Sequence, residues 1–201
     1  MQAIKRTVNL IAVMFVFGYG CGNSSSPPAR AVQDVVSRTQ AAGYDVGFVG
    51  PRNLMNADSL SNHPGLTVIE TTVSFPSQAD GGEVYAWEFY AKSFKPVKLI
   101  IVRLSKGNVE LIGESPMTIP RNIGINFFEL PEPIPIQKFD KIGLLQPEED
   151  SIPFKVVRNW ETMISASTFE RSFIDLNAFS VYGWRYAYRA HWRRVAGAGV
   201  E

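Results

Sequence analysis

The chain is poor in the residues that build most reactive centres. It has one cysteine, Cys21, and two histidines, His63 and His191, in 201 residues. One thiol excludes an internal disulfide bond, and two histidines far apart in the sequence with one cysteine do not supply the three or four suitably spaced ligands of a zinc site. The G-x-S-x-G nucleophile motif of serine hydrolases is also missing. We therefore expect no metal, no cofactor and no enzymatic activity.

The N-terminal apolar run is too short to span a membrane. It covers residues 8–19, is interrupted by Asn9, and falls short of the about 20 residues that a spanning helix needs. Lys5 and Arg6 precede it. A basic start followed by a short apolar run is typical of a secretory signal peptide. We therefore expect the domain behind it to be exported.

The residues directly behind the apolar run are Gly18, Tyr19, Gly20 and Cys21. This order resembles the cleavage site of bacterial lipoproteins, although Leu is usual where Gly18 stands and Ala or Ser where Tyr19 stands. The resemblance implies a signal peptide over residues 1–20 and a lipid on Cys21, which would anchor the protein to a membrane of the cell envelope. A secretory signal that leaves a free cysteine, or an uncleaved anchor, remains open as an alternative.

The segment that follows the cysteine predicts a tether over residues 21–44. Gly22 and Asn23 provide no aspartate behind the cysteine. By resemblance to lipoprotein sorting, this implies the outer rather than the inner membrane if the source is Gram-negative. The Ser and Pro tract over residues 23–30 cannot pack a core and is typical of a solvated linker. The valines of residues 31–42 predict a short amphipathic helix that ends at Gly43.

Neither sign of charge is in excess, because 20 basic residues face 19 acidic ones. Removal of the signal peptide takes Lys5 and Arg6 away and leaves 18 basic residues. Proteins that bind nucleic acid usually present a strongly basic surface. We therefore expect no nucleic-acid partner.

Residues 45–195 predict an all-β domain with a single β-sandwich, followed by a flexible tail over residues 196–201. Short runs of β-branched and aromatic residues are separated by Gly, Pro, Asn or Ser, at a spacing of roughly ten residues. Residues 97–104 are apolar on both faces, which indicates an interior strand, whereas the alternating prolines of residues 131–137 indicate a sheet edge or a crossover.

Two of the predicted strands have distinct faces. In the run over residues 83–91, Tyr85, Trp87 and Phe89 are expected on one face and Glu88 on the other. The closing strand over residues 180–193 is expected to place its aromatic side chains on one face. Its opposite face carries Arg185, Arg189, His191 and Arg193. These arginines would meet an anionic surface or protect a sheet edge.

The order of the β segments resembles the lectin-like or galactose-binding-like jelly-roll domains of modular extracellular proteins. The segments that carry this resemblance cover residues 81–91, 97–104, 111–115, 125–130, 133–145, 152–154 and 186–192. One departure is Phe139, since those domains usually have Gly before the aspartate that stands here at Asp140. The resemblance implies a jelly-roll sandwich with a non-catalytic binding role, and it names no ligand.

Arg158, Asn159 and Trp160 are the candidate ligand-binding residues. Sugar-binding proteins place an aromatic ring beside polar side chains, and Trp160 lies in a polar loop. The alternative is that Trp160 only covers the core. A second candidate is the acidic loop of Glu148, Glu149 and Asp150, whose oxygens suit Ca²⁺, with a solvated loop as the alternative.

The sequence leaves three functions open. The first is a membrane-anchored binding lipoprotein that recognises a glycan or another envelope component. The second is a lipid-anchored accessory protein that docks a protein partner. The third is an envelope hydrolase, for which Glu70 and Glu88 would have to meet from neighbouring strands as a carboxylate pair.

Overall fold

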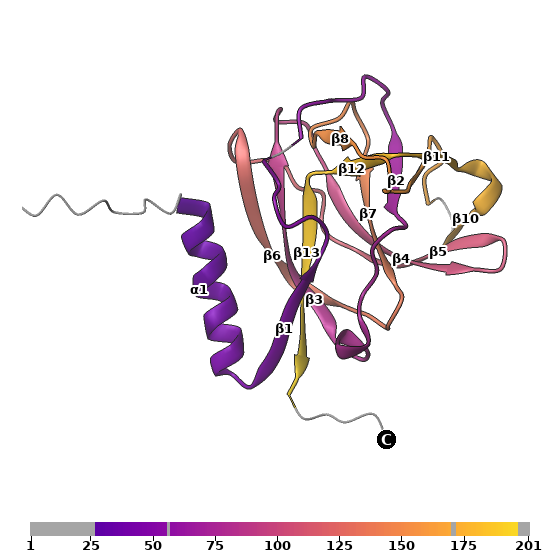
Figure 1. The fold of residues 1–201 in the computed structure, drawn as a ribbon. Helices are drawn as coiled ribbons and strands as arrows, with labels where there is room; N and C mark the ends of the chain where they lie inside the picture. The colour runs from indigo at the N-terminus through magenta and orange to yellow at the C-terminus, as the bar shows by residue number, and fades with distance from the viewer. Residues whose placement is uncertain (1–26, 56, 170–171, 197–201) are drawn as a thin grey trace, which may run out of the picture.

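The computed structural model of the chain describes residues 27–55, 57–169 and 172–196 (Figure 1). The predicted signal peptide, Cys21 with its lipid, and the tail from residue 197 onward lie outside the described residues.

The chain begins with the helix α1 (Pro27–Ala41) and continues in β-strands with two short 3₁₀ turns. The strands are β1 (Tyr44–Val49), β2 (Leu66–Glu70), β3 (Glu83–Ala91), β4 (Lys98–Ser105), β5 (Asn108–Glu114), β6 (Gly124–Pro135), β7 (Lys141–Gln146), β8 (Phe154–Val156), β9 (Thr162–Ser165), β10 (Phe173–Asp175), β11 (Ser180–Tyr182), β12 (Trp184–Tyr186) and β13 (Tyr188–Val195). The 3₁₀ turns are η1 (Ser77–Ala79) and η2 (Leu176–Ala178).

The strands form an antiparallel β-sandwich, as the alternation in the sequence predicts. One sheet has four strands in the order β1-β13-β3-β6, and the other has seven in the order β10-β5-β4-β7-β2-β9-β11. The strands β8 and β12 make a separate pair. The main core contains Trp87 and Phe89 from the first sheet and Leu99, Ile101 and Leu144 from the second. The all-β sandwich is therefore confirmed.

The expected interior strand is confirmed for β4, which lies between β5 and β7. Leu99 and Ile101 face the main core, while Ile100 and Val102 face a second apolar cluster on the opposite side of the sheet. Phe169 and Phe179 cover that second cluster. Both faces of β4 are thus buried, which explains why its sequence is apolar without alternation.

The proline-rich segment lies at a sheet edge, as predicted. Pro131, Pro133 and Pro135 fall within β6, whose only neighbour in the four-stranded sheet is β3. Proline has no N–H to donate to a second neighbouring strand, so an edge position tolerates it.

The predicted face of Tyr85 is wrong. Trp87 and Phe89 belong to the main core, whereas Tyr85 packs with Val35 and Ala86 on the outer face of the sheet. The pairing of β3 with β13 shifts here, because Trp192 pairs with Val84 and His191 with Ala86, so Tyr85 is an extra residue on β3. A β-bulge adds one residue on one strand and moves the next side chain to the other face.

The closing segment forms three strands rather than the single strand predicted. Gly183 separates β11 from β12, and Ala187 separates β12 from β13. Arg185 therefore lies in the pair β8-β12, while Arg189 and Arg193 lie in the four-stranded sheet. The expected common face of the three arginines does not form.

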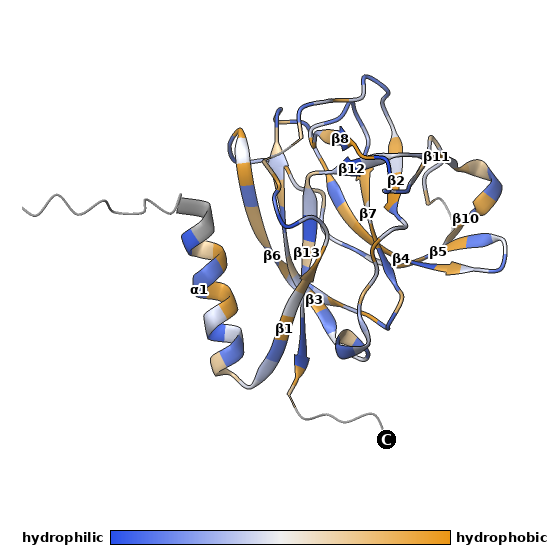
Figure 2. Ribbon diagram, viewed as in Figure 1, coloured by the Kyte–Doolittle hydropathy of each residue, from blue (hydrophilic) through white to orange (hydrophobic). Residues whose placement is uncertain are grey.

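Helix α1 begins at Pro27, four residues before the predicted start, so residues 27–30 of the expected tether are helical. Proline suits the first helical turn because no intrahelical partner needs its N–H. The helix lies against the outer face of the four-stranded sheet, near β1 and β6 (Figure 1). Figure 2 shows that it carries both hydrophilic and hydrophobic residues. Among the described residues, no helix has the length and apolar character needed to cross a membrane.

Candidate functional site

The loop between β8 and β9 carries the three candidate residues of the sequence analysis. Arg158 and Asn159 are exposed, and Trp160 is half-buried. The indole N–H of Trp160 donates a hydrogen bond to Glu70 Oε2. The guanidinium carbon of Arg185 lies 5.3 Å from the centre of the indole ring. The ring is therefore fixed at its edge and covered on one face, with two free polar side chains beside it.

Glu70, which fixes the ring of Trp160, is a fully buried acid at the end of β2. Its Oε1 accepts the backbone N–H of Tyr186 at 3.2 Å. Burial raises the pKa of Glu70 to about 7, against the opposing effect of the hydrogen bonds from Trp160, Tyr186 and Thr162 and of the charge on Arg185. Glu70 therefore changes charge near neutral pH.

The position of Thr162 shows how Glu70 can hold its proton. The Oγ1 of Thr162 lies 3.1 Å from Glu70 Oε2 and also contacts the carbonyl oxygen of Trp184. A hydroxyl has one proton, and a carbonyl oxygen can only accept. When Glu70 is neutral, its carboxyl O–H donates a hydrogen bond to Thr162 Oγ1, and the hydroxyl of Thr162 donates to the carbonyl oxygen of Trp184. When Glu70 is charged, the hydroxyl donates to Glu70 instead and the carbonyl loses that donor.

Tyr186 connects Glu70 to a second buried acid, Asp150. The phenol of Tyr186 donates to Asp150 Oδ2 at 3.2 Å, and the same oxygen accepts the backbone N–H of Ser61 at 3.1 Å. The side-chain amide of Gln146 donates to Asp150 Oδ1 at 2.8 Å. Burial raises the pKa of Asp150 to about 6, against the hydrogen bonds from Ser61 and Tyr186. Both acids are therefore engaged by protein donors.

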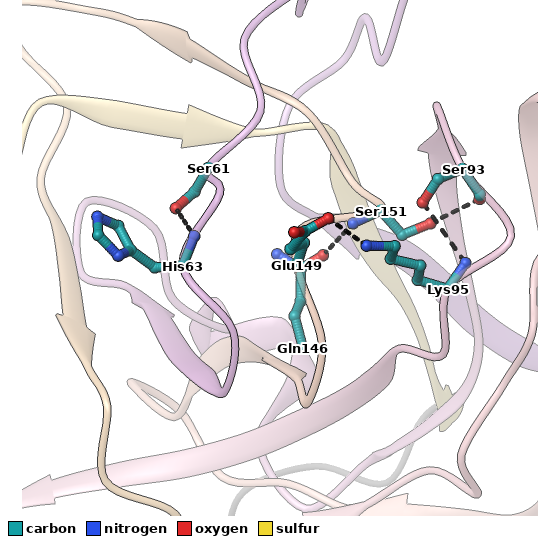
Figure 3. A network of polar contacts seen from close by, with 7 residues as sticks. All are labelled: Ser61, His63, Ser93, Lys95, Gln146, Glu149 and Ser151. Atoms are coloured by element: carbon teal, nitrogen blue, oxygen red, sulfur yellow. Dashed lines mark hydrogen bonds and ion pairs between the residues drawn. The ribbon is translucent and has the colours of Figure 1, made fainter.

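The acidic loop does not gather its three carboxylates around one point. Asp150 points inward to the contacts just described, while Glu149 forms an ion pair with Lys95. Figure 3 shows this ion pair beside the hydrogen bonds that join Ser151 to Gln146 and to Ser93. In the described parts of the chain, no group of three His, Cys, Asp or Glu side chains is arranged to hold a metal ion.

Glu70 and Glu88 do not form the carboxylate pair that a glycosidase would need. Glu70 belongs to the seven-stranded sheet and Glu88 to the four-stranded sheet. The side chain of Glu88 is on the outer face of its sheet, where it contacts Arg189 and His191. Contact between the two acids from neighbouring strands, which the sequence left open, therefore does not occur.

A stack of aromatic rings lies on the other face of the pair β8-β12. Tyr182 stacks on Trp184 with ring centres 4.5 Å apart, and Trp184 stacks on Phe154 at 4.1 Å. Phe154 is buried, Trp184 is half-buried and Tyr182 is 40% exposed. The stack thus runs from the core to the surface and ends on the edge strand β11.

A groove between α1 and the four-stranded sheet is a site that the sequence analysis missed. Its volume is about 560 Å³. Apolar side chains come from α1, β1 and β6, namely Val32, Val36, Val46, Phe48 and Ile125. Polar side chains come from the helix and from the sheet, namely Gln33, Ser37, Gln40, Glu88, Arg189 and His191.

Three charged or titratable side chains lie together at this groove. Glu88 Oε1 forms an ion pair with Arg189 Nη2, and Glu88 Oε2 lies 3.7 Å from His191 Nε2. His191 is 3% exposed, because α1 and the rings of Phe48 and Phe127 cover this position of the strand face. The alternation of β13 predicts its face correctly, but no local pattern indicates that a helix covers that face.

Comparison with known proteins gives no relative, since no protein-family model, no curated protein and no solved structure matches this chain.

Proposed function

We propose that the protein is a lipid-anchored, non-catalytic binding lipoprotein of the cell envelope that recognises a glycan or another envelope component. The anchor rests on the sequence around Cys21, and the resemblance to outer-membrane lipoproteins favours that membrane. Two acids in the described part of the chain, Glu70 and Asp150, have a clearly raised pKa. Both use their oxygens to accept hydrogen bonds from the protein rather than to face a substrate, which supports a binding role over a catalytic one.

The observation that carries this proposal is the way Trp160 is held. Glu70 fixes its N–H edge and Arg185 lies over its ring, so the aromatic ring is rigid before any ligand arrives. Arg158 and Asn159 are exposed beside it. A sugar ring packs its apolar face on such an aromatic surface, and its hydroxyl groups pair with neighbouring polar side chains. Rigidity lowers the entropy that binding would otherwise lose.

Glycan-array binding of the full chain tests the proposal. The double variant Arg158→Ala with Asn159→Ala removes exposed groups and leaves Glu70 and its donors in place, so its fold should be intact. We expect bound glycans to lose at least about tenfold in affinity, which corresponds to one lost charge-assisted hydrogen bond. Lys106→Ala removes an equally exposed cation from the turn between β4 and β5 and is the matched control. An array with no bound glycan, or equal loss in the control, would reject the glycan proposal.

A second candidate is the docking of a protein partner, and the free edge of the seven-stranded sheet favours it. In the described part of the chain, strand β11 pairs only with β9. Exposed apolar side chains lie on β11 and on the turn η2 just before it, namely Leu176, Val181 and Tyr182, each between 37% and 63% exposed. An exposed apolar edge can accept a strand from another chain. Co-purification of one protein at fixed stoichiometry, lost in Val181→Lys and kept in Lys106→Ala, would favour this function.

A further inference from the structure

We propose that the groove between α1 and the four-stranded sheet is a separate binding site for one neutral sugar ring. This goes beyond the proposed function, because the groove lies on the outer face of the four-stranded sheet and shares no residue with the surface around Trp160. Its volume of about 560 Å³ falls within the range of small-molecule sites.

The first argument is that residues lining the groove carry buried polar atoms without a hydrogen bond. Within the described part of the chain, Arg189 Nε and His191 Nε2 are buried and form no hydrogen bond, and Glu88 Oε1 has only its ion pair with Arg189. Buried polar groups are nearly always paired, because an unpaired one costs about 1–3 kcal/mol. A ligand that supplies the missing hydrogen bonds would remove this cost.

The second argument concerns which ligand these atoms fit. Arg189 Nε can only donate and Glu88 Oε1 can only accept, while a histidine nitrogen does either one or the other. A hydroxyl group both donates and accepts, so neighbouring hydroxyls on one ring match this mixed set. Gln33 and Gln40 on α1 add side-chain amides at the rim, which also both donate and accept hydrogen bonds.

The third argument concerns the net charge of the groove. The charges of Glu88 and Arg189 already neutralise each other in an ion pair. An additional anion would lie against the buried carboxylate of Glu88, and an additional cation against the guanidinium of Arg189, so either would leave an uncompensated charge in the groove. The balance favours a ligand without net charge.

The fourth argument is that the groove has an aromatic wall and a cover with room to adjust. Phe48 lines the groove and is 40% exposed, so part of its ring can contact the apolar face of a sugar. Among residues 30–41 of α1, only Val35 and Thr39 are buried. Few fully buried side chains therefore hold the helix to the sheet, and the proposal requires the helix to shift so that a ligand reaches the buried atoms beneath it.

Titration of the full chain with free monosaccharides tests the inference. Glucose, galactose, mannose and N-acetylglucosamine are added at about 10 mM, which nearly saturates a site with a Kd near 1 mM, and binding is read by saturation-transfer NMR in a detergent without a sugar headgroup. We expect at least one of them to bind. We also expect its charged analogues, glucuronate and protonated glucosamine, to bind at least about tenfold more weakly.

Two variants locate the bound sugar. Ser37→Trp places a large ring at the exposed rim of the groove and should abolish binding, while Ala41→Trp adds the same ring to an exposed helix position outside the groove and is the matched control. His191→Phe removes Nε2 from aromatic surroundings. It should reduce affinity about tenfold with little change in the melting temperature, since the deleted atom forms no hydrogen bond and lies 3.7 Å from Glu88 Oε2.

The following results would overturn the inference: no monosaccharide bound, a charged analogue bound as well as the neutral sugar, or affinity unchanged in both Ser37→Trp and His191→Phe. The glycan-array experiment tests the effect of substituting Arg158 and Asn159, whereas this experiment tests the effect of substituting Ser37 and His191. Failure of one proposal is therefore distinguishable from failure of the other.

Discussion

Trp160 donates its indole N–H to the carboxyl group of Glu70, which lies ninety residues earlier in the chain and is fully buried. One partner of this hydrogen bond belongs to a surface loop and the other to the interior. The protonation of an interior acid and the position of a surface ring are therefore linked, and the linkage can be measured.

The stability of the fold should fall as the pH rises from about 4.5 to above 7. Burial raises the pKa of Glu70 from 4.5 to about 7 and that of Asp150 from 3.8 to about 6, so the folded protein binds protons more tightly than the unfolded chain. Each acid therefore contributes stability that is complete below its unfolded pKa and is lost as the pH passes through its folded pKa, about 3 kcal/mol for each. Urea denaturation at several pH values across this range measures how steeply the free energy of unfolding falls with pH.

Glu70→Gln is the control for that slope. An amide has the same shape but does not titrate, so the part of the slope between pH 4.5 and 7 should flatten. The variant should also be less stable than the wild type near pH 5, by about 1–3 kcal/mol, because an amide nitrogen must then face either the N–H of Trp160 or that of Tyr186. An unchanged slope would show that Glu70 does not titrate in this window.

Trp160→Phe should lower stability and shift the titration of Glu70 upward. The variant keeps an aromatic ring under Arg185 but removes the N–H that lowers the pKa of Glu70. Loss of one hydrogen bond to a buried acid should cost about 1–3 kcal/mol at alkaline pH and less where Glu70 is neutral. Denaturation at several pH values separates the loss of stability with charged Glu70 from the loss with neutral Glu70. An equal loss at every pH would contradict a direct contact with Glu70.

Phe139→Gly should stabilise the protein by about 1 kcal/mol. Among the described residues, Phe139 is the only non-glycine with a positive φ, at 71°, a conformation that costs a residue with a Cβ about 1–2 kcal/mol. Its ring is 67% exposed, so little packing is lost when it is removed. Phe139→Ala removes the ring and keeps the strain, and it should bring no gain. Melting temperatures of the two variants provide the comparison.

Asp140→Ala should destabilise the protein by about 3 kcal/mol or more, because the buried carboxylate accepts from Arg103 at 2.8 and 3.0 Å and from the backbone N–H of Gln137 at 2.8 Å. Glu114→Ala breaks the ion pair with Lys98, which lies on the same strand as Arg103, and is the matched comparison. The side chain of Glu114 is 43% exposed against 1% for Asp140, so its loss should cost less than about 1 kcal/mol. Chemical denaturation measures both, and equal losses would refute the role of burial.

The sequence predicts the structure well where the local pattern of one strand determines its environment. The boundaries of β3, the two buried faces of β4 and the edge position of β6 follow from local alternation and from the chemistry of proline.

The sequence is a poor guide where a distant segment decides the outcome. The bulge at Tyr85 depends on how β3 pairs with β13, and the burial of His191 depends on a helix about 150 residues away in the chain. Glu70 is hydrophilic by type, yet Trp160, Thr162 and Tyr186 bury it from three other segments. For these reasons the groove beneath α1 and the pair of raised acids could not be found from local patterns.

The position of β13 determines when the fold can be completed. This strand is the last of the described strands but lies between β1 and β3, so the four-stranded sheet remains divided until residues 188–195 take their place. Tyr188, Ala190 and Trp192 of that strand also fill the main core. The long separation in the chain between β1 and its partner β13 predicts a slow final step of folding.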